Sequence, residues 1–490
     1  MTITARQIAA DVLHRSRSHD AFAAELIDNA VAAANVTPQD RRFLTQLVYG
    51  VIRRKGTLDA LLRPYMKIPF HAVEPRVWDA LHLGAFQLAF LTGVPTHAAV
   101  HETVELANHI GSPKAKGFIN SILRRVSELV TDTFTDKPDG NAVPMDWFPS
   151  PLAGEGLGVR GGASKGNPSP GGEAPPPSPA RGEGRAAGRY RVLARPVLPT
   201  PGTDPAGYFA AAFSFPRWLA DQWHTRYDPD ECRRLGFWFN APPPLWVRVN
   251  KLHNDRETYR LRLAAQLIDA EPGEHPQSLR FPEHHPIRGL PGYDDGDFAV
   301  QDHSSMLVAS ALGLQPGMRV LDLCAAPGGK TTHLAELMDN RGFITACDTE
   351  PRRLETVTTL CQRLRIKGVR TVLLGENDEA PPGPFDAALV DVPCSNTGVL
   401  GRRPEVRWRL KPTEFQYLIR LQTRLLFQAL DRVKSGGLVV YSTCSIEPDE
   451  NEGVVKAVMR GIRNLRLEAE HRAVPGHPSD GGYWARLRKP

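Results

Sequence analysis

The sequence predicts a multidomain protein with an all-α bundle first, a small α+β module next and a doubly wound α/β domain last. Three observations support this. Apolar residues recur at helical spacing through residues 4–130, a stretch rich in Gly and Pro then interrupts the chain, and strand-like and helix-like segments alternate from about residue 301. The length of 490 residues is consistent with two or three domains.

Residues 1–135 are predicted to form the helical bundle. Apolar side chains share one helix face in sets such as Leu44, Leu47, Val48 and Val51. Basic residues cluster in the same region, at Arg41 and Arg42, at Arg53, Arg54 and Lys55, at Lys114 and Lys116, and at Arg124 and Arg125. Such clusters form either a solvated helix surface or a face that contacts phosphates, and the pattern leaves both readings open.

Composition narrows the class of protein. The formal net charge is +6 and the isoelectric point is near 9.0, which is compatible with a polyanionic partner but does not show one. No cysteine pair has Cys-x-x-Cys spacing, so we expect neither a structural zinc site nor a disulfide framework. No apolar run approaches about 18 residues, so we expect no signal peptide and no membrane span. A cytoplasmic monomer without a bound metal is the resulting expectation.

Residues 140–200 are predicted to be an insertion and linker. Nearly half of residues 149–189 are Gly or Pro, and the segment from Pro149 to Gly156 is almost repeated from Pro177 to Gly184. Such a sequence buries too little apolar surface to offset the entropy of ordering it, so we expect disorder there. Residues 205–300 regain folded character, with alternation over 244–250 typical of a strand, and are predicted to form the α+β module.

Residues 301–490 repeat a strand, loop and helix pattern typical of a doubly wound sheet. Strands are predicted at 318–324, 342–348, 385–391 and 437–441, and a helix at 330–337. The carboxyl ends of parallel strands open into a common crevice. Cys394 follows the strand 385–391, which ends at Asp391, and Cys444 follows the strand 437–441. We therefore expect both thiols to face one pocket beside the Asp391 carboxylate, an arrangement suited to covalent chemistry on a pyrimidine base.

The loop after the first of these strands is a candidate cofactor site. It lacks both the dinucleotide-binding and the Walker glycine patterns, but two adjacent glycines let a ligand approach the backbone and the following helix begins with a partial positive charge. Asp348 ends the second strand, where an acid can bond ribose hydroxyls. An adenosine with an amino-acid tail, S-adenosylmethionine, satisfies these features. The loop residues are Cys324, Ala325, Ala326, Pro327, Gly328, Gly329 and Lys330.

Three segments resemble the RNA 5-methylcytosine methyltransferases. They are the segment 321–333 around the glycine pair, the segment 391–399 containing Asp-Val-Pro-Cys, and the segment 441–452 containing Ser-Thr-Cys-Ser. The first domain resembles the NusB-type RNA-binding fold through Gly50-Val-Ile-Arg-Arg and Asn120-Ser-Ile-Leu-Arg-Arg. The whole architecture, except 140–200, is similar to members of the family that modify one cytosine of 16S ribosomal RNA. The third domain is then expected to be a Rossmann-like methyltransferase.

The resemblance implies roles for individual residues. Cys444 is the nucleophile that adds to carbon 6 of cytosine, Asp391 protonates or hydrogen-bonds ring nitrogen 3, and Cys394 assists release of the methylated base. The 324–330 loop, Asp348 and Asp391 hold S-adenosylmethionine. The family usually places a further acid after the third strand, in a Gly-Asp pair. Here the sequence is Gly-Glu-Asn-Asp, so Glu376 is the first choice, with Asn377 and Asp378 as alternatives.

Some alternatives remain open. Lys330 contacts either cofactor or substrate. Arg402, Arg403, Arg407, Trp408 and Arg409 either hold RNA near the site or form an exposed helix surface. A DNA cytosine methyltransferase, a methyltransferase for another RNA, and a non-catalytic RNA-binding assembly factor are the competing functions. The Thr443-Cys444 motif argues against the DNA enzyme, and retention of both cysteines and the glycine loop argues against a non-catalytic factor. The missing dinucleotide pattern argues against a nicotinamide dehydrogenase.

Overall fold

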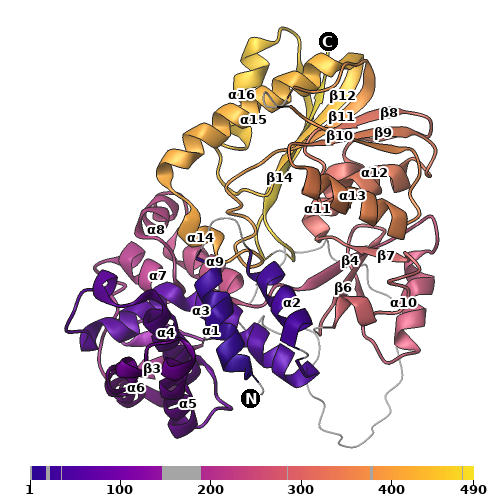
Figure 1. Cartoon of the computed structure of the whole chain (residues 1–490). Coiled ribbons are helices and arrows are strands. Elements are labelled where there is room, and N and C mark those ends of the chain that lie inside the picture. Colours follow the sequence, from indigo (N-terminus) through magenta and orange to yellow (C-terminus); the bar gives the residue numbers. More distant parts are fainter. Residues whose placement is uncertain are drawn as a thin grey trace, which may run out of the picture. The chain divides into compact units, whose positions relative to one another are not determined.

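The computed structural model describes residues 3–17, 22–34, 36–145, 189–283, 285–375, 379–476 and 478–490. It divides into two compact units, Met1–Ala241 and Pro242–Pro490 (Figure 1). The fold class predicted from the sequence is confirmed: a helical N-terminal domain, a small connecting module and a Rossmann-like C-terminal domain. Within the described residues, no helix combines the length and the hydropathy that crossing a bilayer demands.

The first unit begins with a helical bundle whose helices start where the sequence supplies capping residues. Thr37 accepts a hydrogen bond from the Asp40 amide at the start of the longest helix, and Pro38 occupies its first position. The apolar set Leu44, Leu47, Val48 and Val51 is buried, as its spacing predicts. The bundle comprises α1 Ala5–Arg15, α2 Ala23–Ala34, α3 Pro38–Leu62, α4 Pro75–Phe90, α5 Thr96–His109 and α6 Lys116–Leu129, with 3-10 turns at Arg63–Tyr65, Phe70–Ala72 and Pro113–Ala115.

A small antiparallel sheet follows the bundle. Its strand order is β1-β3-β2, with β1 Val130–Thr135, β2 Ala142–Pro144 and β3 Tyr190–Leu193. Pro144 faces Tyr190 in the register, so the two ends of the predicted insertion are paired neighbours. The predicted 140–200 linker therefore contains two strands, at 142–144 and 190–193, where the apolar residues at 142, 143, 190 and 193 are buried. The predicted disorder of 149–189 concerns residues almost wholly outside those described.

Three helices complete the first unit: α7 Pro205–Phe213, α8 Arg217–His224 and α9 Pro229–Asn240. Their aromatic side chains pack together, with Phe209 stacked on Phe213 and Phe215. Thr57 of α3 donates to the Ala212 carbonyl at 2.8 Å and ties α7 to the bundle. The first compact unit thus ends inside the segment 205–300 that the sequence groups as one α+β module.

The second unit opens with a four-stranded antiparallel sheet of order β5-β6-β4-β7. The aromatic rings of Tyr259 and Phe298 and the aliphatic side chains around them form its core. Its elements are β4 Leu245–Val249, α10 Arg256–Ala264, β5 Glu271–Pro272, β6 Ser278–Phe281, a 3-10 turn Ile287–Gly289 and β7 Phe298–Val300.

The large sheet of the second unit has seven strands in the order β10-β9-β8-β11-β12-β14-β13. The first five strands in this order are parallel, as predicted, whereas β14 runs antiparallel to both of its neighbours, β12 and β13. The sheet is therefore mixed rather than wholly parallel, because the last two strands form a hairpin that needs no crossover helix. The strands are β8 Arg319–Asp322, β9 Phe343–Asp348, β10 Val369–Leu373, β11 Phe385–Asp391, β12 Val433–Thr443, β13 Arg466–Ala473 and β14 Gly482–Arg488.

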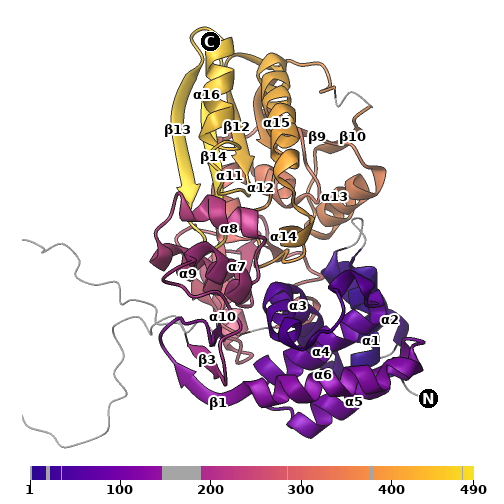
Figure 2. The same cartoon turned by 90° about the vertical axis from the view of Figure 1, so that its left-hand side faces the viewer.

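Helices cover both faces of this sheet (Figures 1 and 2). Alternate residues of β11 show the two-sided burial: Ala388 and Val390 pack with α15 and α16, while Ala387 and Leu389 pack with α11 and α12. This leaves the carboxyl ends of β8, β9, β11 and β12 to present their loops together. The helices are α11 His303–Ser310, α12 Gly329–Leu337, α13 Pro351–Arg363, α14 Val406–Arg409, α15 Pro412–Arg432 and α16 Glu452–Gly461.

Candidate active site

The two cysteine loops leave neighbouring parallel strands. Asp391 at the end of β11 is paired in register with Ser442 of β12, so Cys394 and Cys444 lie just beyond the same edge of the sheet. Their sulfur atoms are 3.1 Å apart. Cys444 Sγ also donates a hydrogen bond to Asn396 Oδ1 at 3.2 Å. The structure thus brings together the two thiols that the sequence places in one crevice.

The two thiols have different surroundings. Cys394 is buried and Cys444 is half-buried. The hydrogen bond with Cys444 raises the pKa of the Cys394 thiol well above its ordinary value, and burial and the negative charge of Glu450 raise it further. Cys394 is therefore held as a neutral thiol near pH 7, which leaves the more accessible Cys444 as the better candidate for the reactive thiolate.

Asp391 is held by two donors on separate elements. Lys330 Nζ on α12 contacts its Oδ2 at 2.8 Å, and Ser442 Oγ on β12 donates to its Oδ1 at 2.7 Å. Burial opposes the positive charge of Lys330, but the Asp391 carboxylate outweighs burial and raises the pKa of that ammonium. In this structure Lys330 therefore pairs with Asp391, and its contact with cofactor or substrate stays a prediction.

The 324–330 loop turns from β8 into α12. Gly328 adopts a φ of +102°, which L side chains rarely adopt, and a Cβ there would lie 3.0 Å from the Val357 backbone. A Cβ on Gly329, by contrast, would meet no described atom within 4 Å. Space therefore remains open over the first residue of α12, where backbone N–H groups and the helix dipole favour an anionic group.

Asp348 at the end of β9 holds this loop. Its Oδ2 accepts from the Ala326 amide at 3.3 Å, and its Oδ1 accepts from the Thr349 amide at 2.9 Å. Arg353 contacts the same carboxylate at 3.1 Å. Asp348 is nearly fully buried, and its contact with the Ala326 amide fixes the loop. Its contact with a ribose stays a prediction. The further candidates Glu376, Asn377 and Asp378 lie outside the described residues.

Asp322, at the end of β8, was not among the predicted site residues. Burial raises its pKa to about 7, although a hydrogen bond from Thr331 Oγ1 at 2.6 Å opposes the shift. Its Oδ1 is buried with no hydrogen-bond partner among the described residues. Asp322 lies in the segment 321–333, two residues before Cys324, so its position in the sequence could have identified it as a site residue.

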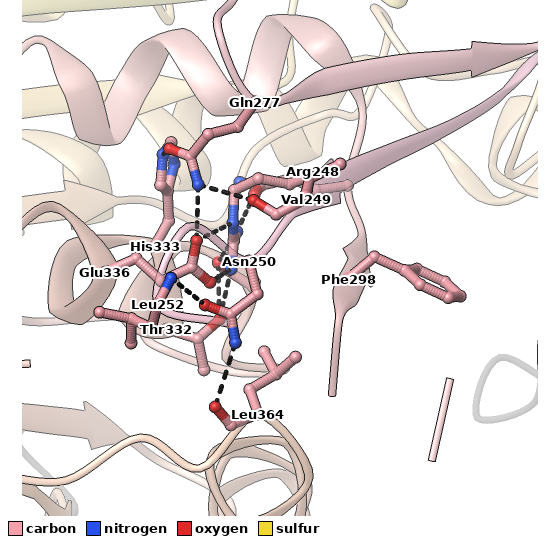
Figure 3. Close-up of polar contacts among 12 residues, drawn as sticks. Arg248, Val249, Asn250, Leu252, Gln277, Phe298, Thr332, His333, Glu336 and Leu364 are labelled. Carbon is pink, nitrogen blue, oxygen red and sulfur yellow. Dashed lines mark hydrogen bonds and ion pairs between the residues drawn. The ribbon is translucent and has the colours of Figure 1, made fainter. Parts of the chain in front are cut away.

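A buried arginine supports the helix that follows the loop (Figure 3). Arg248 of β4 is fully buried and donates to both carboxylate oxygens of Glu336, at 2.7 and 3.1 Å. It also donates to the Gly329 carbonyl at 2.8 Å and to Thr332 Oγ1 at 3.0 Å, and it contacts Gln301 Oε1. One side chain of the small sheet thereby fixes both the first residue and the last turns of α12.

The basic residues near Cys394 divide into different roles. Arg407 is fully buried. Arg402 pairs with Asp302 at 2.8 Å and with Asp480. Arg407 is therefore not exposed to an RNA phosphate, and the charge of Arg402 is already paired with two carboxylates. Arg403 differs, because it is exposed and its Nη1 donates at 3.2 Å to Asn396 Oδ1, the oxygen that also accepts from Cys444.

The basic clusters of the helical bundle also divide. Arg54 is buried and donates to the Pro144 carbonyl at 2.7 Å, so it has a structural role. Arg124 and Arg125 are exposed and remain candidates for a phosphate-contacting face. Across the part of the chain that the structure describes, no group of three or more His, Cys, Asp or Glu side chains is placed to hold a metal ion.

Comparisons with known proteins agree with this architecture. Residues 309–477 match the family described as 16S rRNA methyltransferase RsmB/F, residues 3–128 match the NusB family, and residues 215–288 match the ferredoxin-like domain of RsmF/B-like methyltransferases. A probable ribosomal RNA small subunit methyltransferase B from Synechocystis is 32% identical over 474 residues, covering 95% of this chain and 91% of that protein.

Solved structures show the same fold. The crystal structure of PH0851 aligns with a TM-score of 0.73 at 21% identity, covering all of both chains. A methyltransferase homolog protein from Pyrococcus horikoshii aligns with a TM-score of 0.51 at 26% identity, covering 59% of this chain and all of that one.

Proposed function

This chain belongs to the RsmB/F family of 16S rRNA methyltransferases, and from that premise we propose that it methylates carbon 5 of a cytosine in 16S ribosomal RNA. The cofactor of the proposed reaction is S-adenosylmethionine and the nucleophile is Cys444. The observation that carries the proposal is the 3.1 Å separation of the two sulfur atoms beside Asp391. A single-cysteine mechanism needs no second thiol at that distance.

The residues around α12 fit S-adenosylmethionine. The open space over Gly329 and the start of the helix suit its carboxylate, and Asp348 suits its ribose. When bound, the cofactor supplies a methyl group on a positively charged sulfur. The side chains of the chain itself perform the remaining steps.

Cys444 acts as the nucleophile. Its thiolate forms a bond to carbon 6 of cytosine, and this addition makes carbon 5 electron-rich enough to accept a methyl group. The target carbon is inaccessible in a stacked helix, so the base must be flipped out or already unpaired. Arg403 is exposed beside Asn396 and lies where it can hold the flanking RNA backbone.

Asp391 acts on ring nitrogen 3. A proton or hydrogen bond there stabilises the electron density that the addition pushes into the ring. Asp391 is paired with Lys330 as a carboxylate, so the Lys330 ammonium, whose pKa the pair raises, passes a proton to Asp391 as Asp391 donates one to ring nitrogen 3. Ser442 fixes the carboxylate orientation.

Cys394 releases the product. Its thiol proton passes to the Cys444 sulfur as the bond between that sulfur and carbon 6 breaks, and the Cys394 thiolate takes the proton lost from carbon 5. Both residues finish as thiols, and the carbon 5–carbon 6 double bond is restored. The neutral state of Cys394 and the short distance between sulfurs suit this exchange.

The test is methylation of unmodified small-subunit rRNA with labelled S-adenosylmethionine, comparing the unaltered chain with Cys444→Ala and Cys394→Ala. We expect a product methylated at carbon 5 of cytosine with the unaltered chain, neither product nor adduct with Cys444→Ala, and a trapped RNA adduct with Cys394→Ala. Active Cys444→Ala with inactive Cys394→Ala would reverse the two roles. No methylation by any form would favour the non-catalytic assembly factor.

A further inference from the structure

One buried carboxylate joins the two cysteine loops. Ser395 follows Cys394 and Ser445 follows Cys444, and both hydroxyls donate to Glu450 Oε2, the Ser445 bond measuring 2.6 Å. The Ser395 amide donates to Glu450 Oε1 at 2.9 Å. The residue directly after each thiol is thus attached to the same side chain.

The attachment extends into the helices behind the site. Gln422 of α15 donates one N–H to Glu450 Oε1 at 2.8 Å and contacts the Pro393 carbonyl at 2.9 Å. Tyr441 of β12 donates its hydroxyl to the Glu450 carbonyl oxygen at 2.5 Å. Glu450, Gln422 and Tyr441 are fully buried. Both the side chain and the backbone of Glu450 are therefore fixed by the scaffold.

The chemistry of this contact set makes it sensitive to loop position. A carboxylate only accepts hydrogen bonds, and a buried one is costly unless its oxygens are satisfied. The two described donors to Oε1 are N–H groups, which can donate a hydrogen bond but not accept one. Both described donors to Oε2 are hydroxyls of the cysteine loops. Withdrawal of either loop would leave part of the buried charge without its donors.

We propose that Glu450 is a positioning residue that fixes the separation of Cys394 and Cys444 and so permits proton exchange between them. This inference rests on the proposed two-cysteine function. Glu450 touches neither reacting sulfur directly in the described contacts, and it acts through Ser395 and Ser445. It also contributes to keeping Cys394 protonated, since its negative charge raises the pKa of that thiol after the larger effects of the Cys444 hydrogen bond and burial.

The first test measures thiol separation without RNA. Phenylarsine oxide binds two adjacent thiols together and releases water, so the full-length chain should bind it through Cys394 and Cys444, and Cys394→Ala should not. We expect Glu450→Leu to weaken this binding at least about tenfold, and Glu450→Gln, which keeps one acceptor oxygen, to restore much of it. Glu452→Leu is the matched control, because Glu452 lies two residues away and pairs with Arg472.

The second test measures the consequence for release. In the methylation assay, Glu450→Leu should lengthen the lifetime of the RNA adduct at least about tenfold, while Glu452→Leu should leave it unchanged. The pH profile of Cys394 alkylation should also move to lower pH in Glu450→Leu. Neither readout is expected from a purely structural role of Glu450. If Glu450→Leu does not fold, the double variant Ser395→Ala with Ser445→Ala takes its place in both tests, because it removes the two hydroxyls that attach the cysteine loops to Glu450.

Unchanged arsenical binding and unchanged adduct lifetime in a folded Glu450→Leu chain would overturn the inference. The arsenical arm does not depend on methylation, so it separates the two proposals. An unaltered chain that binds the arsenical but methylates no RNA would count against the proposed function alone. A chain that methylates RNA while Glu450→Leu keeps both readouts would count against the role of Glu450 alone.

Discussion

Removing Arg248 should loosen the helix that carries the predicted cofactor loop. In the structure its guanidinium satisfies Glu336, the Gly329 carbonyl and Thr332 from a fully buried position. Arg248→Met keeps much of the volume but leaves the Glu336 carboxylate with Gln277, at 2.7 Å, as its remaining described donor. The substitution should therefore lower the free energy of unfolding, because the buried Glu336 carboxylate loses the cation that compensates its charge.

The expected magnitude follows from that loss. Breaking a buried ion pair by removing one partner costs about 3–5 kcal/mol, which is a large share of the roughly 5–15 kcal/mol that stabilises a typical domain. Removing both charges in Arg248→Met with Glu336→Leu eliminates the uncompensated carboxylate. The double variant should therefore be less destabilised than the sum of the two single variants by about 2 kcal/mol or more.

Hydrogen exchange of the full-length chain is the suitable assay, because a protein of two units need not unfold in one step. Amides of α12 and β4 should lose protection in each single variant and recover part of it in the double variant. The affinity for S-adenosylmethionine should fall with α12 protection. Exchange in Arg248→Met within about 1 kcal/mol of the unaltered chain, or strictly additive single variants, would refute the reasoning.

Three further predictions follow from the structure. Burial raises the pKa of Asp322 to about 7, so the folded chain retains a proton that the unfolded chain releases near pH 4. The stability from this group is full below about pH 4 and is lost as pH rises through about 7, and Asp322→Asn should flatten that part of a pH–melting curve. Gly328→Ala should lower the melting temperature because of its positive φ, whereas Gly329→Ala should fold normally yet lose S-adenosylmethionine in calorimetry. Equal cofactor binding by Gly329→Ala would contradict the placement. Replacing residues 147–187 by a short Gly-Ser turn should preserve the melting temperature or raise it slightly. Strands β2 and β3 already pair, and each doubling of the length of a flexible loop adds only about 0.6 kcal/mol to the entropic cost of closing it. An unfolded product would show that the segment has a structural role.

The sequence predicts the strands and loops of the site because their signals are local. The apolar run 385–391, the following Pro-Cys and the adjacent glycines each lie within a few residues, and strand order then brings Cys394 and Cys444 together. The antiparallel C-terminal hairpin was not predicted, because direction depends on how β13 and β14 connect rather than on their composition.

Residues that act through distant contacts were missed. Arg248 lies 88 positions from Glu336, and nothing in the alternating strand 244–250 indicates that its arginine points into a buried carboxylate. Glu450 looks like an ordinary acidic residue in a polar turn, and only the folded chain shows that two serines share it. The position of Asn396, two residues after Cys394, could have placed it near the site. Its hydrogen bond from Cys444, however, depends on how the chain folds.

The place of β12 in the sheet has a consequence for the order in which the protein matures. This strand, which leads to Cys444, is flanked by β11 on one side and by β14 on the other. β14 begins at Gly482, well after the cysteine has been synthesised. Until β14 emerges, one edge of β12 has unpaired backbone groups, which is a hazard for aggregation. The strand that leads to Cys444 is thus completed late in translation, so a nascent chain can form its N-terminal bundle long before it can complete the sheet that carries the candidate site.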